Sequence, residues 1–91
     1  MRAYDNTTTV AANEFWPRNV QYGITGQIGS DVRDQLQGIA DSLHDHIRSW
    51  VYDSEDEAYD TLNARLDYIL EHNYPHCKGI ISEHVSFVIV F

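Results

Sequence analysis

The sequence contains very little lysine, and this shortage limits what the protein can bind. Lys78 is the only lysine among 91 residues, so lysine and arginine together number six, against fourteen aspartates and glutamates. The resulting formal net charge is −8 at pH 7. Such a charge opposes non-specific binding to nucleic acid or to anionic lipid, because both are themselves negative. We therefore expect no direct contact with nucleic acid or membrane, and a basic protein as partner.

Cysteine and long apolar runs are also scarce. Cys77 is the only cysteine and cannot form a disulfide within the chain, so a secreted, disulfide-stapled scaffold is disfavoured and a cytoplasmic setting is expected. No apolar stretch approaches the ~20 residues that a membrane-spanning helix needs. The first six residues lack the apolar run of a signal peptide. These absences together predict a soluble cytoplasmic protein.

What the sequence does contain is typical of one small globular domain. Apolar residues make up 43% of the chain, and two Trp, six Tyr and three Phe supply aromatic side chains, which disordered acidic chains lack. A chain of this length can build one core but not two. We therefore predict a single domain over residues 1–91.

Two helices are predicted in the middle of the chain, over residues 30–52 and 54–74. The first follows from apolar residues that recur at steps of three or four, which is the spacing of one helical face. These residues are Val32, Leu36, Ile39, Leu43, Ile47 and Trp50. The second helix begins with Ser54 followed three residues later by Glu57, a capping box, and Pro75 ends it.

Strands are predicted on both sides of this helical pair. Residues 1–29 form a strand and loop region with candidate strands at 7–11 and 19–25, and residues 80–91 form a C-terminal strand. In that strand Val85, Phe87, Ile89 and Phe91 alternate with Ser86, Val88 and Val90, and because its last residues are apolar on both faces, the pattern suits an interior strand. The predicted fold class is α+β with two layers. In it, a small antiparallel sheet of the N-terminal strands and the C-terminal strand packs on an antiparallel pair of acidic helices. A second subunit covering the far face of the C-terminal strand would make a homodimer.

Motifs that carry chemistry are largely missing. Cys77 lies near His72 and His76, but no neighbouring residues provide a catalytic context for a thiol nucleophile. His44 and His46 are two residues apart, about 200° around a helix, so both cannot ligate one ion. The sequence also lacks zinc, calcium and phosphate-loop patterns. We expect no catalytic residue, no metal and no cofactor.

The acidic residues are concentrated in the helical pair. The segment 30–73 holds eleven acids and three bases, so 3 − 11 = −8 accounts for the whole net charge. On the first helix Asp34, Asp41 and Asp45 align opposite the apolar face, and on the second Asp56, Asp60, Asp67 and Glu71 do the same. A solvated helix face is the plain interpretation. Against it, neither helix carries a lysine, although ordinary surfaces pair Glu with Lys at i,i+4.

These acids and the nearby tyrosines are the candidate partner-binding residues. They are Asp41, Asp45, Tyr52, Asp53, Asp56, Tyr59, Asp60, Asp67, Tyr68 and Glu71. The stripe from Asp56 to Glu71 spans about 22 Å of helix. Duplex DNA presents roughly 13 phosphate charges over that length, against four in the stripe. Two helices side by side approach the charge density of DNA without reaching it. Mimicry of DNA would therefore require a dimer, or would be only partial.

The segment Leu43-His44-Asp45-His46-Ile47, with the acidic and aromatic residues that follow, resembles phage anti-restriction proteins that mimic DNA. In size and charge the chain is also similar to phage anti-CRISPR proteins. This resemblance implies a non-enzymatic inhibitor of a host nucleic-acid-binding defence complex, CRISPR-Cas or restriction, acting in the host cell cytoplasm. The anti-restriction proteins are more acidic throughout and mostly helical, whereas this chain ends in an apolar strand, and no functional residue can be carried over.

Two alternatives remain open at the level of sequence. One is an immunity-type inhibitor that plugs a basic nuclease active site, an interpretation based on charge and size. The other is a structural or assembly module that pairs through the apolar C-terminal strand, with the acidic face merely solvated.

Overall fold

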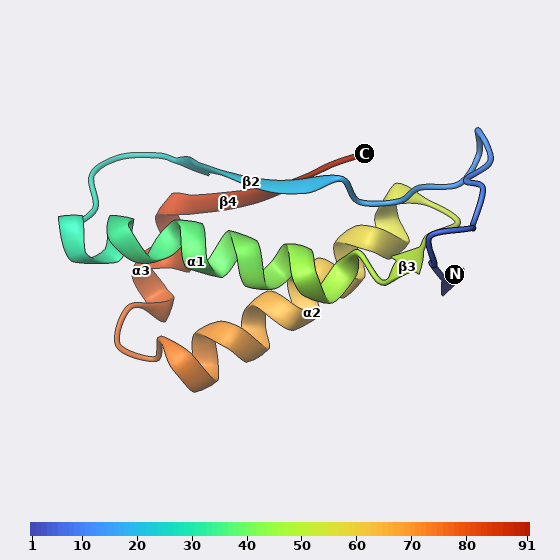
Figure 1. Cartoon of the computed structure of the whole chain (residues 1–91). Helices are drawn as coiled ribbons and strands as arrows, with labels where there is room; N and C mark the ends of the chain where they lie inside the picture. Colours follow the sequence, from blue (N-terminus) through green and yellow to red (C-terminus); the bar gives the residue numbers. More distant parts are fainter.

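The computed structural model describes all residues 1–91 and has an α+β fold, as predicted (Figure 1). Its elements follow the order β1 (Arg2–Ala3), β2 (Asn19–Ile24), α1 (Ser30–Ile47), β3 (Trp50–Val51), α2 (Glu55–Asn73), α3 (Lys78–His84) and β4 (Val85–Val90). The two long helices run in opposite directions, and α1 lies beside the β2–β4 pair (Figure 1).

The strands form two separate sheets of two strands each, rather than one sheet. β2 pairs antiparallel with β4, from Asn19 opposite Val90 to Ile24 opposite Val85, so the predicted strand at 19–25 is confirmed to within one residue. β1 instead pairs with β3. Of the N-terminal strands, only β2 therefore shares a sheet with the C-terminal strand, which corrects the prediction of a single sheet.

The predicted strand at residues 7–11 is wrong, because a local turn takes its place. The Asp5 carboxylate accepts hydrogen bonds from the Thr7 backbone N–H at 2.8 Å, the Thr7 hydroxyl at 2.7 Å and the Thr8 hydroxyl at 3.0 Å. Aspartate side chains commonly stabilise turns by bonding the backbone two residues onward. These bonds fold the threonines over Asp5 and leave the following residues without a strand partner.

The first helix ends five residues earlier than predicted. Its last backbone bond runs from the Arg48 N–H to the His44 carbonyl at 3.0 Å, and the chain then turns. Trp50 was predicted on the apolar helix face, but it belongs to β3, pairs with Ala3 and is 38% exposed. The next residue, Val51, is buried in its place. Strand pairing with the N-terminus therefore overrides the helical spacing at this point.

The second helix matches its prediction closely. The Ser54 hydroxyl accepts a hydrogen bond from the Glu57 N–H at 3.2 Å, as in a capping box. The Glu57 carboxylate accepts a hydrogen bond from the Asp53 N–H, also at 3.2 Å, whereas in the standard capping box it would accept from the N–H of Ser54. The bond to Ser54 satisfies an N–H group that the first turn of a helix leaves unpaired, and the second bond fixes the residue before the cap.

The C-terminal segment divides into a helix and a strand, so the predicted strand at 80–91 is wrong over its first five residues. β2 ends at Ile24, and the Thr25 N–H bonds the His84 carbonyl at 2.7 Å where the paired region stops. A strand continuing back from Val85 would have no neighbour. In α3 the backbone groups bond one another instead, and Ile81 is buried against the core.

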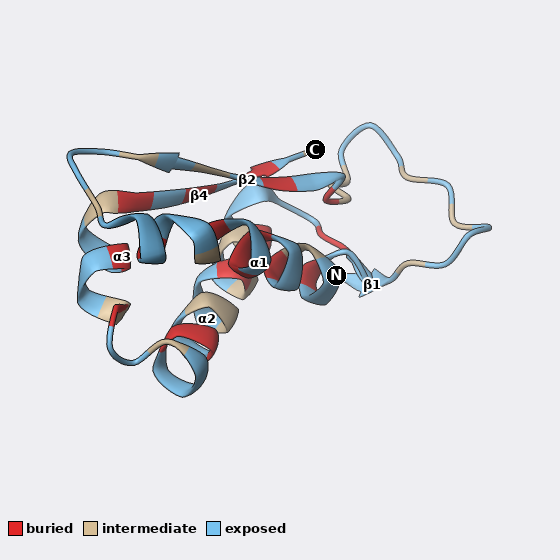
Figure 2. Ribbon diagram, turned by 60° about the vertical axis from the view of Figure 1, so that its left-hand side comes forward, coloured by how far each residue is buried: buried red, intermediate tan, exposed pale blue.

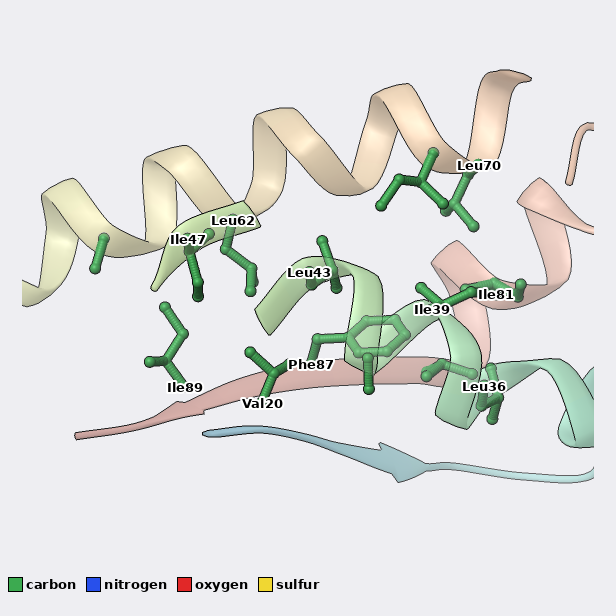
Figure 3. Close-up of a cluster of buried hydrophobic side chains, with 14 of the residues drawn as sticks. Val20, Leu36, Ile39, Leu43, Ile47, Leu62, Leu70, Ile81, Phe87 and Ile89 are labelled. Atoms are coloured by element: carbon green, nitrogen blue, oxygen red, sulfur yellow. The ribbon is translucent and has the colours of Figure 1, made fainter. Parts of the chain in front are cut away.

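The core lies between the β2–β4 sheet and the helices. Along β4, Val85, Phe87 and Ile89 are buried, while the residues between them are exposed, as the alternating colours in Figure 2 show. In the close-up of Figure 3, Phe87 and Ile89 point from β4 toward the helices, and Leu43 and Leu62 come from α1 and α2. The alternation predicted for this strand is thus confirmed. β4 is nevertheless not an interior strand, because β2 is its only neighbour.

Candidate functional site

The strongest concentration of free charge is the outer side of α2, which we call the α2 stripe: Asp56, Asp60, Asp67 and Glu71. All four are exposed, and they lie on the side of the helix opposite the buried Ala58, Leu62 and Ile69. None of the four takes part in an ion pair. The ion pairs of the structure involve the Met1 amine, Arg2 and His84. The stripe therefore presents four uncompensated carboxylates to solvent.

The acids of α1 form a second, separate stripe. Asp34, Asp41 and Asp45 are exposed, and the Asp41 carboxylate accepts a hydrogen bond from the Gln37 amide at 3.0 Å. The side of α1 that faces α2 carries His46 instead of an acid. A groove therefore separates the two stripes. The sequence suggested that two helices side by side would combine their acids, but the stripes do not merge into a single acidic face.

The groove between α1 and α2 has a volume of about 450 Å³ and contains a basic centre. Its lining residues are His46, Asp60, Thr61, Ala64, Arg65 and Tyr68. The Arg65 guanidinium lies 4.8 Å from the centroid of the Tyr68 ring, and its Nε atom is buried without a hydrogen-bond partner. Burial, and then the positive charge of Arg65, lower the pKa of His46.

The three candidate tyrosines have different environments, and only one is free to anchor a partner. Tyr52 is fully buried and its hydroxyl donates to the Ile47 carbonyl at 3.0 Å, so its prediction as a contact residue is wrong. Tyr59 is partly buried and its hydroxyl accepts the Ile89 N–H at 2.9 Å. Tyr68 is 51% exposed and stacks on His72, with ring centroids 4.3 Å apart.

Asp53 lies apart from the α2 stripe and already has a partner. Its carboxylate is 3.0 Å from the Met1 amine, which also lies 3.3 Å from the Glu57 carboxylate. These contacts, with the bond to Asp53 first, raise the pKa of the amine. Asp53 therefore offers less free charge to a partner than the stripe residues do.

Cys77 and the residue types that bind metal ions were the sequence candidates for chemistry. Cys77 is buried, its thiol donates to the Tyr74 carbonyl at 3.6 Å, and burial raises its pKa, which opposes formation of the nucleophilic thiolate. No three His, Cys, Asp or Glu side chains gather in a way that could hold a metal ion. None of the helices has the length and apolar character needed to cross a bilayer.

Sequence reasoning identified the acids but missed the groove. Arg65 and Tyr68 are three residues apart on α2, a spacing that places them side by side and could have indicated their contact. The approach of His46 from α1 depends on how the two helices pack. Comparison with known protein families, characterised proteins and solved structures gave no match to this chain. Its function therefore has to be inferred from its surface chemistry.

Proposed function

We propose that this protein is a non-enzymatic inhibitor of a nucleic-acid-binding defence complex, either CRISPR-Cas or restriction, and that its α2 stripe blocks a basic surface of that complex. The supporting observation is the set of four exposed carboxylates on one helix side with no ion-pair partner within the chain. A basic groove that binds phosphates would attract such a surface and associate with it rapidly.

The spacing of the acids in the α2 stripe destabilises the helix, and a soluble surface does not need this spacing. Asp56 and Asp60, and likewise Asp67 and Glu71, are like charges at i,i+4, where repulsion destabilises a helix by about 0.2–0.5 kcal/mol per pair. Replacing one acid of each pair with lysine would remove this repulsion and keep the surface hydrophilic. The retained acids therefore support a role in binding.

The separation of the two stripes determines which kind of inhibition we favour. Four carboxylates over about 22 Å cannot reproduce the roughly 13 phosphate charges of duplex DNA. The acids of α1 do not fill this gap, because the groove with His46 and Arg65 intervenes. We therefore favour a local plug in a basic surface over mimicry of a DNA duplex. Tyr68, exposed at the rim of the groove, supplies an aromatic anchor beside Asp60.

The test is an inhibition assay against purified restriction endonucleases and CRISPR effector nucleases, with DNA cleavage as the readout. The wild-type protein should inhibit at least one of them, and added salt should weaken the inhibition. The triple variant Asp60→Lys, Asp67→Lys and Glu71→Lys changes the net charge from −8 to −2, since each replacement adds two. It should lose inhibition while its circular dichroism spectrum stays unchanged.

A control variant with the same net charge distinguishes the effect of the α2 stripe on inhibition from the effect of the net charge of the whole protein. The variant Asp31→Lys, Asp34→Lys and Glu83→Lys also has a net charge of −2, and these three acids are exposed outside the α2 stripe. It should inhibit as the wild type does, apart from a slower association. Equal inhibition by the stripe variant, or no inhibition of any nuclease by the wild type, would rule out the proposal.

A further inference from the structure

One edge of the β2–β4 sheet is open. The Thr25 N–H bonds the His84 carbonyl, so the hydrogen-bonded pairs of the ladder fall on odd-numbered residues of β2. The backbone N–H and C=O groups of Val20, Tyr22 and Ile24 consequently point away from β4. No other element of the chain bonds to them. A shallow hollow of about 360 Å³, lined by residues 19–22 and Gln37, lies along this edge.

The opposite edge, on β4, is covered near its C-terminal end. There the Ile89 N–H points outward and donates to the Tyr59 hydroxyl from α2 at 2.9 Å. Proteins usually protect exposed edges with lysine, proline or a covering element, because unpaired strands recruit other strands. β2 has neither a charged residue nor a proline, and its edge has no such cover. The difference between the two edges marks β2 as the pairing surface.

We propose that β2 pairs antiparallel with β2 of a second copy of this chain, around a two-fold axis at Tyr22. The direction of the free backbone groups determines the register. Tyr22 lies opposite Tyr22 of the partner subunit, and Val20 lies opposite Ile24 of the partner subunit. Three hydrogen-bonded pairs of this kind supply about six hydrogen bonds. The product is a four-stranded sheet in the order β4-β2-β2-β4.

The distribution of charge favours a second copy as the occupant. Neither β2 nor β4 contains a charged residue, although the chain as a whole has a net charge of −8. The strands themselves therefore offer no charge to select a basic or acidic partner, and the nearest acid at the hollow, Asp41, is hydrogen-bonded to Gln37. A two-fold axis perpendicular to the sheet keeps both helical layers on one face, and each α2 stripe remains on the outer side of its own α2.

Partly buried apolar side chains support the same occupant. Tyr22 and Ile24 pack against the core but remain half-buried, since they lie at the uncovered margin of the inner face. The same residues of the partner subunit would cover them. This inference does not depend on the proposed function. If both hold, the dimer presents two α2 stripes.

A pair of charge variants on the exposed outer face tests this register. In it, Gln21 lies directly opposite Gly23 of the partner subunit, in a non-hydrogen-bonded pair whose side chains approach closely. A Cβ atom at Gly23 would meet nothing within 4 Å, so the site accepts a side chain. The variant Gln21→Lys with Gly23→Lys places like charges in both pairs. The variant Gln21→Lys with Gly23→Glu places opposite charges there.

Sedimentation equilibrium over a wide range of protein concentration measures the outcome. The wild type and the Lys/Glu variant should reach twice the chain mass of 10.5 kDa. The Lys/Lys variant should dissociate at least about tenfold more readily than the Lys/Glu variant, with an unchanged circular dichroism spectrum. A wild type that stays monomeric throughout would overturn the proposal. So would equal dissociation constants for the two variants, because the interface would then lie elsewhere.

Discussion

Replacing Tyr52 with phenylalanine tests whether this residue belongs to the core or to a binding surface. The Tyr52 side chain is fully buried, and its hydroxyl donates to the Ile47 carbonyl at 3.0 Å. Ile47 is the last residue of α1, and its carbonyl has no acceptor role within the helix because the chain turns away. The hydroxyl of Tyr52 therefore closes the end of α1.

The expected loss of stability follows from this single bond. Removal of the hydroxyl leaves the Ile47 carbonyl buried without a partner, which costs about 1–3 kcal/mol. The ring itself remains and leaves no large cavity. For a domain of this size, each kcal/mol corresponds to about 4–8 °C in the unfolding midpoint. We therefore expect Tyr52→Phe to unfold roughly 4–24 °C below the wild type.

Thermal unfolding followed by circular dichroism measures this shift, with Tyr68→Phe as the matched control. Tyr68 is half exposed and its hydroxyl makes no hydrogen bond within the chain, so its replacement should leave the midpoint unchanged. Because burial raises the pKa of Tyr52, the stability that its protonated form provides is present below pH 10 and is lost as pH rises above it. Tyr52→Phe should lack that alkaline loss. Equal midpoints for the two variants would refute the buried hydrogen bond.

Two further predictions concern the ends and the neighbours of α2. Ser54→Ala removes the acceptor for the Glu57 N–H and should cost about 1 kcal/mol in urea unfolding, whereas Ser42→Ala, on the exposed side of α1, should cost nothing. Burial lowers the pKa of His46 below 6.5, so its contribution to stability is complete above pH 6.5 and declines as pH falls. NMR titration should show this lowered pKa, and Arg65→Gln should raise it; an unmoved pKa would contradict the contact between the two groups.

Local signals in the sequence were sufficient for the central part of the fold. Ser54 and Glu57 at capping-box spacing, followed by Pro75, placed both ends of α2 correctly. The alternation of Val85, Phe87 and Ile89 identified the buried face of β4. These features depend on residues within one or two turns of each other, so they can be read without knowing the rest of the chain.

The errors occurred where a distant partner decided the local structure. Trp50 has helical spacing, but pairing with Ala3 draws it into β3. Residues 80–84 have the composition of a strand, yet β2 ends before it could pair with them, so they form α3. Each segment adopts the conformation in which its backbone groups find hydrogen-bond partners.

The candidate site also has features that the sequence determines and features that depend on tertiary packing. Composition and helical spacing determined the net charge of −8 and the acids of the α2 stripe, because both depend only on residue type and position along a helix. Tertiary packing decided that Tyr52 is buried and that a groove with Arg65 separates the two stripes. It also left the β2 edge open, because β4 is the only strand that pairs with β2. The edge on β4, by contrast, is bonded by Tyr59 at Ile89.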